Sequence, residues 1–160
     1  MADLLVVMGV AGTGKTTVGR LVARHLGRVF LEGDDFHPED NRARMAAGEP
    51  LSNSDRRVWI AAISAAFTAL GQPAVLACSA LNTQVRDWLA ADCACEPVYV
   101  MLDGPVELIR ARLEARTDHH MSVGMLDSQL AALDPPETVA RFDIRETPED
   151  IAAAIALRLG

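Results

Sequence analysis

The sequence of 160 residues contains little cysteine, few aromatic residues and less positive than negative charge. Its three cysteines, Cys78, Cys93 and Cys95, are an odd number and lack the spacing of a metal site. We therefore expect reduced thiols in a cytoplasmic protein. The net charge of −7 argues against non-specific binding to nucleic acid or to an anionic membrane. An anionic substrate would need local positive charge.

Long apolar runs are also missing. None reaches the ~18 residues that a membrane-spanning helix needs. The N-terminal residues lack the basic start of a secretory signal, and their apolar run continues into a glycine-rich loop. The length suits one domain with one core, and half of the residues are hydrophobic. We expect a single domain over residues 1–160.

Short apolar runs alternate with amphipathic stretches along the chain. Strands are expected at residues 4–8, 29–31, 74–78, 98–102 and, with a weaker pattern, 139–144. Helices are expected at residues 15–26, 39–47, 55–70, 83–91, 105–113, 126–133 and 148–159. This alternation predicts a three-layer α/β fold with a parallel sheet. In such sheets, ligands bind at the carboxyl ends of the strands.

The strongest local signal is a phosphate-binding loop. Residues 9–16, GVAGTGKT, fit the pattern G-x-x-x-x-G-K-[ST] between an expected strand and an expected helix. Backbone N–H groups and the helix N-terminus hold phosphate oxygens in such loops. We expect Lys15 to reach the β- and γ-phosphates of ATP and the Thr16 hydroxyl to ligate Mg²⁺. The predicted nucleotide-binding residues of this segment are Gly9, Ala11, Gly12, Thr13, Gly14, Lys15, Thr16 and Thr17.

The loop alone does not distinguish a kinase from a GTPase switch or an ATP-driven machine. The guanine-reading pattern N-K-x-D is absent, which disfavours a GTPase. A hydrophobic strand that ends in Asp–Glu, typical of ATP-driven machines, is absent as well. The polar segment at residues 116–124 has two arginines close to its start, which favours a small-molecule kinase with a lid.

Three carboxylates follow the second expected strand in the stretch FLEGDDFHP, residues 30–38. We expect Asp34 to orient the acceptor and to take the proton of its attacking hydroxyl group. Glu32 is expected to hold Mg²⁺ through water, and Asp35 to face solvent. The alternative is an acidic turn that caps the next helix. His37 is expected either to bind a polyol or carboxylate, or to cap that helix.

Arg112 and Arg116 flank the expected lid. Closure of the lid could bring their guanidinium groups onto the transferring phosphoryl group. We prefer Arg116 as a catalytic residue, together with Lys15 and Asp34. The alternative for both arginines is a solvated helix face.

Many segments of the chain resemble the gluconokinase family. The match runs from the phosphate loop to about residue 136. The segments that carry it are Gly33-Asp34-Asp35-Phe36-His37-Pro38, Asn41, Met45, Gly48-Glu49-Pro50-Leu51, Asp55-Arg56, Trp59, Cys78-Ser79-Ala80-Leu81, Arg86-Asp87, Ala115-Arg116, His119, Met125-Leu126 and Ser128-Gln129.

The resemblance implies that ATP phosphorylates D-gluconate at its 6-hydroxyl group, with Mg²⁺ present. It implies a fold similar to shikimate and nucleoside-monophosphate kinases, with a five-stranded parallel sheet, a substrate-binding segment at about 34–60 and a mobile lid at about 112–126. It also suggests a homodimer. Arg56 or Arg86 would bind the carboxylate of gluconate. The predicted substrate-binding residues are Asp34, His37, Asn41, Arg56, Ser79, Arg86 and His119.

The chain departs from the family pattern at several positions. They are Glu32 for Asp, Ser52, Asn53 and Ser54 for an acidic run, Val58 for Pro, Asn82 for Lys and, in the lid, Asp118-His119-His120 for Gly-His-Phe. A kinase of the same fold that acts on another sugar acid or on shikimate is the nearest alternative. A non-catalytic nucleotide-binding module is a second. An ATP-driven nucleic-acid enzyme is disfavoured by the negative charge.

Overall fold

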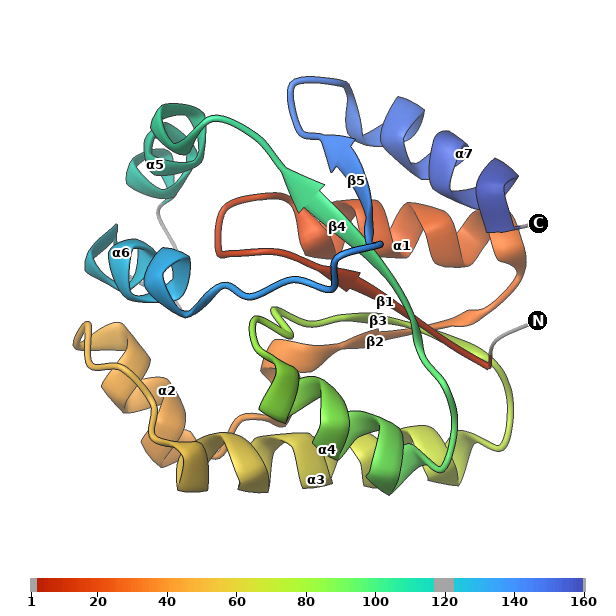
Figure 1. Cartoon of the computed structure of the whole chain (residues 1–160), viewed down its shortest axis with the longest axis horizontal. Coiled ribbons are helices and arrows are strands. Elements are labelled where there is room, and N and C mark those ends of the chain that lie inside the picture. The colour runs from red at the N-terminus through yellow and green to blue at the C-terminus, as the bar shows by residue number, and fades with distance from the viewer. Residues whose placement is uncertain (1–2, 117–122, 160) are drawn as a thin grey trace.

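The computed structural model describes residues 3–116 and 123–159, and its centre is one parallel sheet. The five strands lie in the order β2-β3-β1-β4-β5 (Figure 1). The predicted three-layer α/β fold is therefore confirmed. The strands are β1 (Leu4–Met8), β2 (Val29–Glu32), β3 (Ala74–Ala77), β4 (Val98–Asp103) and β5 (Ala140–Asp143).

Helices cover both faces of this sheet. On one face α1 packs against α7, and on the other α3 packs against α4 (Figure 1). None of the helices within 3–116 and 123–159 has the length and apolarity to cross a bilayer. The helices are α1 (Lys15–Leu26), the 3-10 helix η1 (Gly33–Phe36), α2 (Glu39–Ala46), α3 (Asn53–Leu70), α4 (Thr83–Cys93), α5 (Val106–Ala115), α6 (Val123–Ala132) and α7 (Pro148–Leu159).

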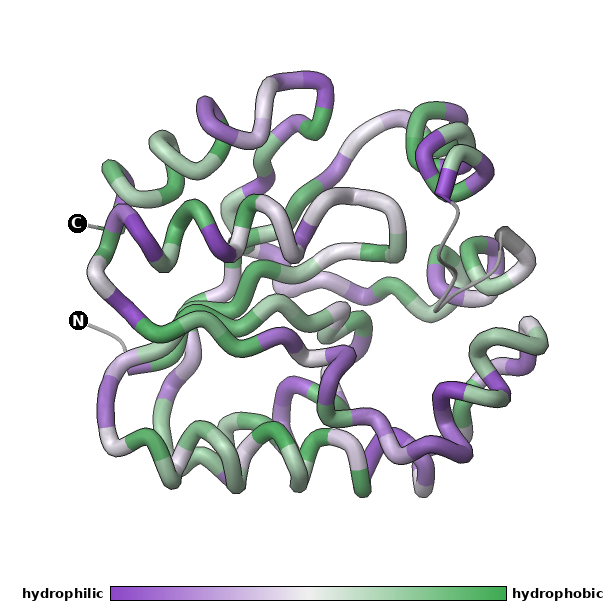
Figure 2. The backbone as a smooth tube through the Cα atoms, turned by 180° about the vertical axis from the view of Figure 1, so that it is seen from behind, coloured by the Kyte–Doolittle hydropathy of each residue, from purple (hydrophilic) through white to green (hydrophobic). Residues whose placement is uncertain are grey.

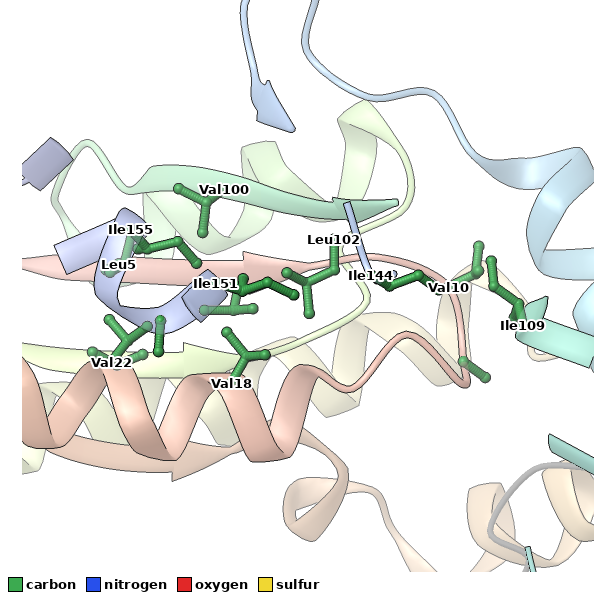
Figure 3. Close-up of a cluster of buried hydrophobic side chains, with 14 of the residues drawn as sticks. Leu5, Val10, Val18, Val22, Val100, Leu102, Ile109, Ile144, Ile151 and Ile155 are labelled. Carbon is green, nitrogen blue, oxygen red and sulfur yellow. The ribbon is translucent and has the colours of Figure 1, made fainter. Parts of the chain in front are cut away.

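The central strand β1 is buried on both faces. Leu5 and Val7 point into the cluster beneath α1 and α7, part of which Figure 3 shows. Leu4 and Val6, which alternate with them, point into the cluster that includes Trp59 of α3. Figure 2 shows the hydrophobic colour along the strands in the middle of the molecule. A strand covered on both faces reads as a continuous apolar run, so its sequence predicts it well.

Side chains cap the first turns of three helices. Ser52 is the N-cap of α3, so this helix begins at Asn53 and not at Asp55. Asn82 caps α4 by accepting a hydrogen bond from the Val85 N–H at 3.0 Å. At the start of α7 the Thr147 hydroxyl accepts from the Asp150 N–H at 3.1 Å.

The carboxyl ends of the strands meet at one end of the sheet, where α2, α5 and α6 lie (left side of Figure 1). β1 leads into the phosphate loop, and β2 leads into η1. Gly33 makes this second turn possible. A Cβ atom at that position would lie 2.5 Å from the Ala77 carbonyl oxygen, so only glycine lets η1 approach β3 so closely.

Candidate active site

A cavity of about 690 Å³ opens at the carboxyl ends of the strands. Its lining combines the phosphate loop, the acidic end of β2, the start of α3 and residues of α5 and α6. Twelve of the predicted site residues border it: Ala11, Gly12, Gly14, Lys15, Thr16, Thr17, Glu32, Asp34, His37, Arg56, Ser79 and Arg116. The structure therefore brings together most of the site that the sequence predicts.

The phosphate loop is held in a fixed curve by its own hydrogen bonds. The Thr13 hydroxyl and the Lys15 ammonium both donate to the Val10 carbonyl oxygen, at 2.8 and 2.9 Å. Gly12 has a φ of 86°, and a Cβ there would lie 3.0 Å from the Leu113 side chain. The loop thus needs glycine both for its backbone conformation and for its contact with α5.

Charges of both signs surround Lys15. Burial lowers its pKa, the Asp34 carboxylate opposes that effect, and the Arg116 guanidinium adds to it. Among the residues that the structure describes, the lining carries four cationic side chains (Lys15, Arg20, Arg56 and Arg116) against three carboxylates (Glu32, Asp34 and Asp35). A chain of strongly negative net charge therefore places an excess of positive charge in the described part of this cavity. That is the local condition an anionic ligand requires.

Glu32 and Thr16 meet across the cavity. The Thr16 hydroxyl donates a hydrogen bond to the Glu32 carboxylate, which also accepts from the Asp34 N–H at 3.3 Å. Hydroxyl and carboxylate oxygens are the ligands that Mg²⁺ takes in phosphate sites, where waters and phosphate oxygens complete its shell. The two residues therefore fit the predicted role of holding Mg²⁺ beside a nucleotide.

His37 lies just beyond η1, buried between two side chains. Its ring stacks on Trp59 with 4.2 Å between centroids, and its Nε2 lies 3.9 Å from an Asp34 carboxylate oxygen. The Trp59 indole N–H donates to the Gly33 carbonyl oxygen at 2.8 Å. Trp59 is only 4% exposed and packs in the core, although it also borders the cavity.

The start of α3 is fixed by a capping box and an ion pair. The Ser52 hydroxyl accepts from the Asp55 N–H, and the Asp55 carboxylate accepts from the Ser52 N–H at 2.9 Å. The Arg44 guanidinium on α2 also donates to Asp55 at 2.5 Å. These donors, the Ser52 N–H above all, lower the pKa of Asp55 to about 2. They hold Arg56, the next residue, at the cavity.

The two candidate carboxylate-binding arginines lie in different environments. Arg56 borders the cavity half-buried, and burial lowers its pKa. Its backbone N–H donates to the Ser52 carbonyl oxygen, whereas its guanidinium makes no hydrogen bond or ion pair within residues 3–116 and 123–159. Arg86 lies outside the cavity lining and donates to the carbonyl oxygens of Ala80 and Asp134, at 2.9 and 2.6 Å. Two backbone carbonyls thus hold the Arg86 guanidinium outside the described lining of the cavity, and the substrate contact predicted for Arg86 stays a prediction.

Other predicted residues are also displaced from the cavity. Asn41 is buried behind His37, and its amide donates to the Asp55 carbonyl oxygen at 3.2 Å. Arg112 donates to the Ile144 carbonyl oxygen at 2.8 Å, so it holds the loop between β5 and α7 and does not line the cavity. Neither the predicted contact of Asn41 with substrate nor that of Arg112 with phosphate is supported by these positions. His119 lies outside the described residues.

The sequence reasoning missed residues of α6. The Gln129 side-chain oxygen accepts a hydrogen bond of 2.7 Å from the Ala11 N–H of the phosphate loop. Met125 packs with Met45 and Leu51 in a small cluster that joins α6 to the α2 segment. The sequence held one signal for this contact, since Ser128-Gln129 was part of the family resemblance.

Several departures from the family pattern lie away from the cavity. Ser52 and Asn82 are helix N-caps, and Val58 is 57% exposed on α3. None of these three borders the cavity, nor do Asn53 and Ser54. Glu32 borders the cavity, and its carboxylate still reaches Thr16. The lid departures Asp118 and His120 lie outside the described residues.

Comparisons with known proteins agree with this geometry. A family model described as an AAA domain matches residues 4–136. A probable gluconokinase of Mus musculus is 40% identical over an alignment of 174 residues, gaps included, which covers 95% of this chain and 95% of the relative. The thermosensitive gluconokinase of Escherichia coli is 38% identical over 149 residues, covering 89% of this chain and 79% of that protein.

Solved structures are similar as well. A gluconokinase from Sinorhizobium meliloti 1021 superposes with a TM-score of 0.81 at 34% identity, over 97% of this chain and 94% of that one. A shikimate kinase from Aquifex aeolicus gives a TM-score of 0.59 at 16% identity, over 98% of this chain and 95% of that one. The second likeness is one of fold alone.

The buried imidazole makes stability depend on pH. Burial is the main cause that lowers the pKa of His37 to about 4, with the Asp34 carboxylate opposing and the Arg42 guanidinium assisting. Between pH 6.5 and 4 the unfolded chain binds this proton and the folded chain does not, so stability falls as the pH falls. Denaturant unfolding measures the free energy of unfolding at pH 7.5 and at pH 4.5. Its decrease between these pH values should be smaller by roughly 2 kcal/mol in His37→Gln than in the unaltered protein. An equal acid loss in both proteins would contradict a neutral buried imidazole.

Proposed function

Because the chain belongs to the gluconokinase family, we propose that it transfers the γ-phosphoryl group of ATP to the 6-hydroxyl group of D-gluconate. The observation that carries this proposal is the pairing of two features in one cavity. A phosphate loop with its lysine lies at one side, and at another lies the half-buried Arg56, whose guanidinium makes no hydrogen bond or ion pair with the described residues. Asp34 borders the same cavity as both.

Asp34 is the proposed general base. It lies in η1, which follows β2, its side chain is exposed at the cavity, and its charge acts on Lys15. Asp34 would take the proton of the attacking hydroxyl group while the oxygen of that hydroxyl group bonds to the γ-phosphorus. The bond from that phosphorus to the β,γ-bridging oxygen breaks, and ADP leaves with the electron pair.

Lys15 and Arg116 are the proposed charge stabilisers. Lys15 would exchange its hydrogen bond with the Val10 carbonyl for phosphate oxygens. Arg116 ends α5 at the edge of the cavity and is exposed, so its guanidinium has donors for an arriving anion. Thr16 and Glu32 would hold Mg²⁺, which neutralises phosphate charge when bound.

Gluconate suits the remaining lining. Its carboxylate would bind Arg56, since a desolvated guanidinium without a hydrogen-bond partner among the described residues favours a bidentate anion. Ser79 borders the cavity and carries a hydroxyl group for the hydroxyl groups of gluconate. A different sugar acid would satisfy Arg56 in the same way, and a shikimate kinase shares the fold. The adenine is expected near the loop between β5 and α7, which Arg112 holds.

The base assignment predicts a selective loss of transfer. Asp34→Asn keeps the shape of the side chain but cannot take a proton, so kcat should fall about 10²–10⁴-fold while ATP still binds. Coupled ADP release measures kcat, and titration calorimetry measures ATP binding. Asp40→Asn is the matched control, because Asp40 is exposed on α2 and lies outside the cavity lining. Full activity of Asp34→Asn would rule out Asp34 as the base.

The carboxylate assignment predicts a change in KM. Arg56→Ala should raise KM for D-gluconate about 10–100-fold, the equivalent of a lost charged hydrogen-bond pair, and leave KM for ATP unchanged. The neighbouring Arg57 pairs with Asp92 at 2.6 Å outside the cavity, so Arg57→Ala is the control. The assignment fails if both variants keep the KM of the unaltered protein for gluconate.

A further inference from the structure

His37 is the most enclosed titratable side chain between α2 and the cavity. It is 7% exposed and is packed face to face against Trp59, with 14° between the ring planes. Its two ring nitrogens point to different partners. Nδ1 lies 3.5 Å from the Asn41 amide nitrogen, and Nε2 lies 3.9 Å from the Asp34 carboxylate.

The contacts of Asn41 fix which ring nitrogen carries the proton. The Asp55 carbonyl oxygen can only accept, so the Asn41 atom at 3.2 Å from it must be the NH₂ group. The same NH₂ group faces His37 Nδ1 and has only donors to offer. In a neutral ring, Nδ1 must then be the acceptor and Nε2 the N–H.

We propose that Asn41 locks His37 in its neutral Nε2–H form, and that this ring acts as a positioning residue for Asp34. Nε2 lies 3.9 Å from the Asp34 carboxylate, beyond hydrogen-bond distance, and the Asp34 side chain is 52% exposed, so a turn of that side chain would bring its carboxylate to the Nε2–H group. A neutral donor orients a carboxylate without neutralising it, so Asp34 keeps its capacity to take a proton. This role for His37 rests on the proposed function of Asp34 as the base.

Hydrogen bonds hold the residues that surround this contact. Asp55, whose carbonyl holds Asn41, is itself held by the Ser52 capping box and by Arg44. On the other side, Trp59 is tied to Gly33, the residue before Asp34. The orientation of the carboxylate therefore depends on both α2 and α3. A charged imidazole is disfavoured here, because burial lowers the pKa of His37 to about 4.

The tautomer is measured directly and needs no substrate. In protein labelled with ¹⁵N-histidine, long-range ¹H–¹⁵N spectra at pH 7.5 should show His37 with an unprotonated Nδ1 and a protonated Nε2. The signal is assigned by its loss in His37→Gln. In Asn41→Asp, the new carboxylate accepts from Nδ1, so the proton should move there or the ring should become charged. Asn53→Asp, the same change at an exposed site outside the cavity lining, should leave the spectrum unchanged.

Activity then tests the positioning role. Glutamine places its NH₂ group where Nε2 lies, whereas asparagine places it where Nδ1 lies. The kcat of His37→Gln for D-gluconate should therefore exceed that of His37→Asn about tenfold, with the same KM for ATP in both.

A proton on Nδ1 in the unaltered protein would overturn the proposal, and so would equal kcat values for the two variants. If the unaltered protein does not phosphorylate gluconate, the proposed function fails and the positioning role fails with it, whereas the spectrum still decides the tautomer.

Discussion

The parallel register of β1, β3 and β2 determines where the charged groups of the site lie. Glu32 at the end of β2 pairs with Ala77 of β3, which in turn pairs with Val7 of β1, two residues before the phosphate loop begins. The acidic segment and the phosphate loop therefore leave the sheet at the same level. Slipping β2 by one residue would turn the Glu32 side chain to the opposite face, away from Thr16. The tight contact of Gly33 with Ala77 helps to keep this register.

The distribution of charged side chains differs between the cavity and the rest of the protein. The protein is acidic as a whole, yet its cavity gathers four cationic side chains, and one of them, Arg56, has no partner among the residues described. Leaving such a cation half-buried costs free energy that a bound carboxylate would return. The arginines that serve the fold, Arg86 and Arg112, are in contrast bound to backbone carbonyls.

Much of this arrangement could be predicted from the sequence. The apolar runs gave the strands because a parallel sheet is buried on both faces, and the phosphate loop is recognisable from its glycines and lysine. Contacts between distant segments could not be predicted. Nothing local to Arg86 indicates that its guanidinium donates to the carbonyl oxygen of Asp134, 48 residues further on. Likewise, the Gln129 side-chain oxygen accepts a hydrogen bond from the Ala11 N–H, which lies 118 residues earlier in the chain. Asn41 was expected to touch substrate, but α2 places it in the interior, where its amide contacts the His37 ring.

In the proposed reaction, this cavity transfers a phosphoryl group to the terminal hydroxyl group of a sugar acid. The most direct test is ³¹P and ¹³C NMR of the reaction of Mg·ATP with ¹³C-labelled D-gluconate. We expect one sugar phosphate, with phosphorus coupled to C6, formed in equal amount to ADP. Release of inorganic phosphate at the same rate with and without gluconate, or a phosphoryl group on any other carbon, would contradict it.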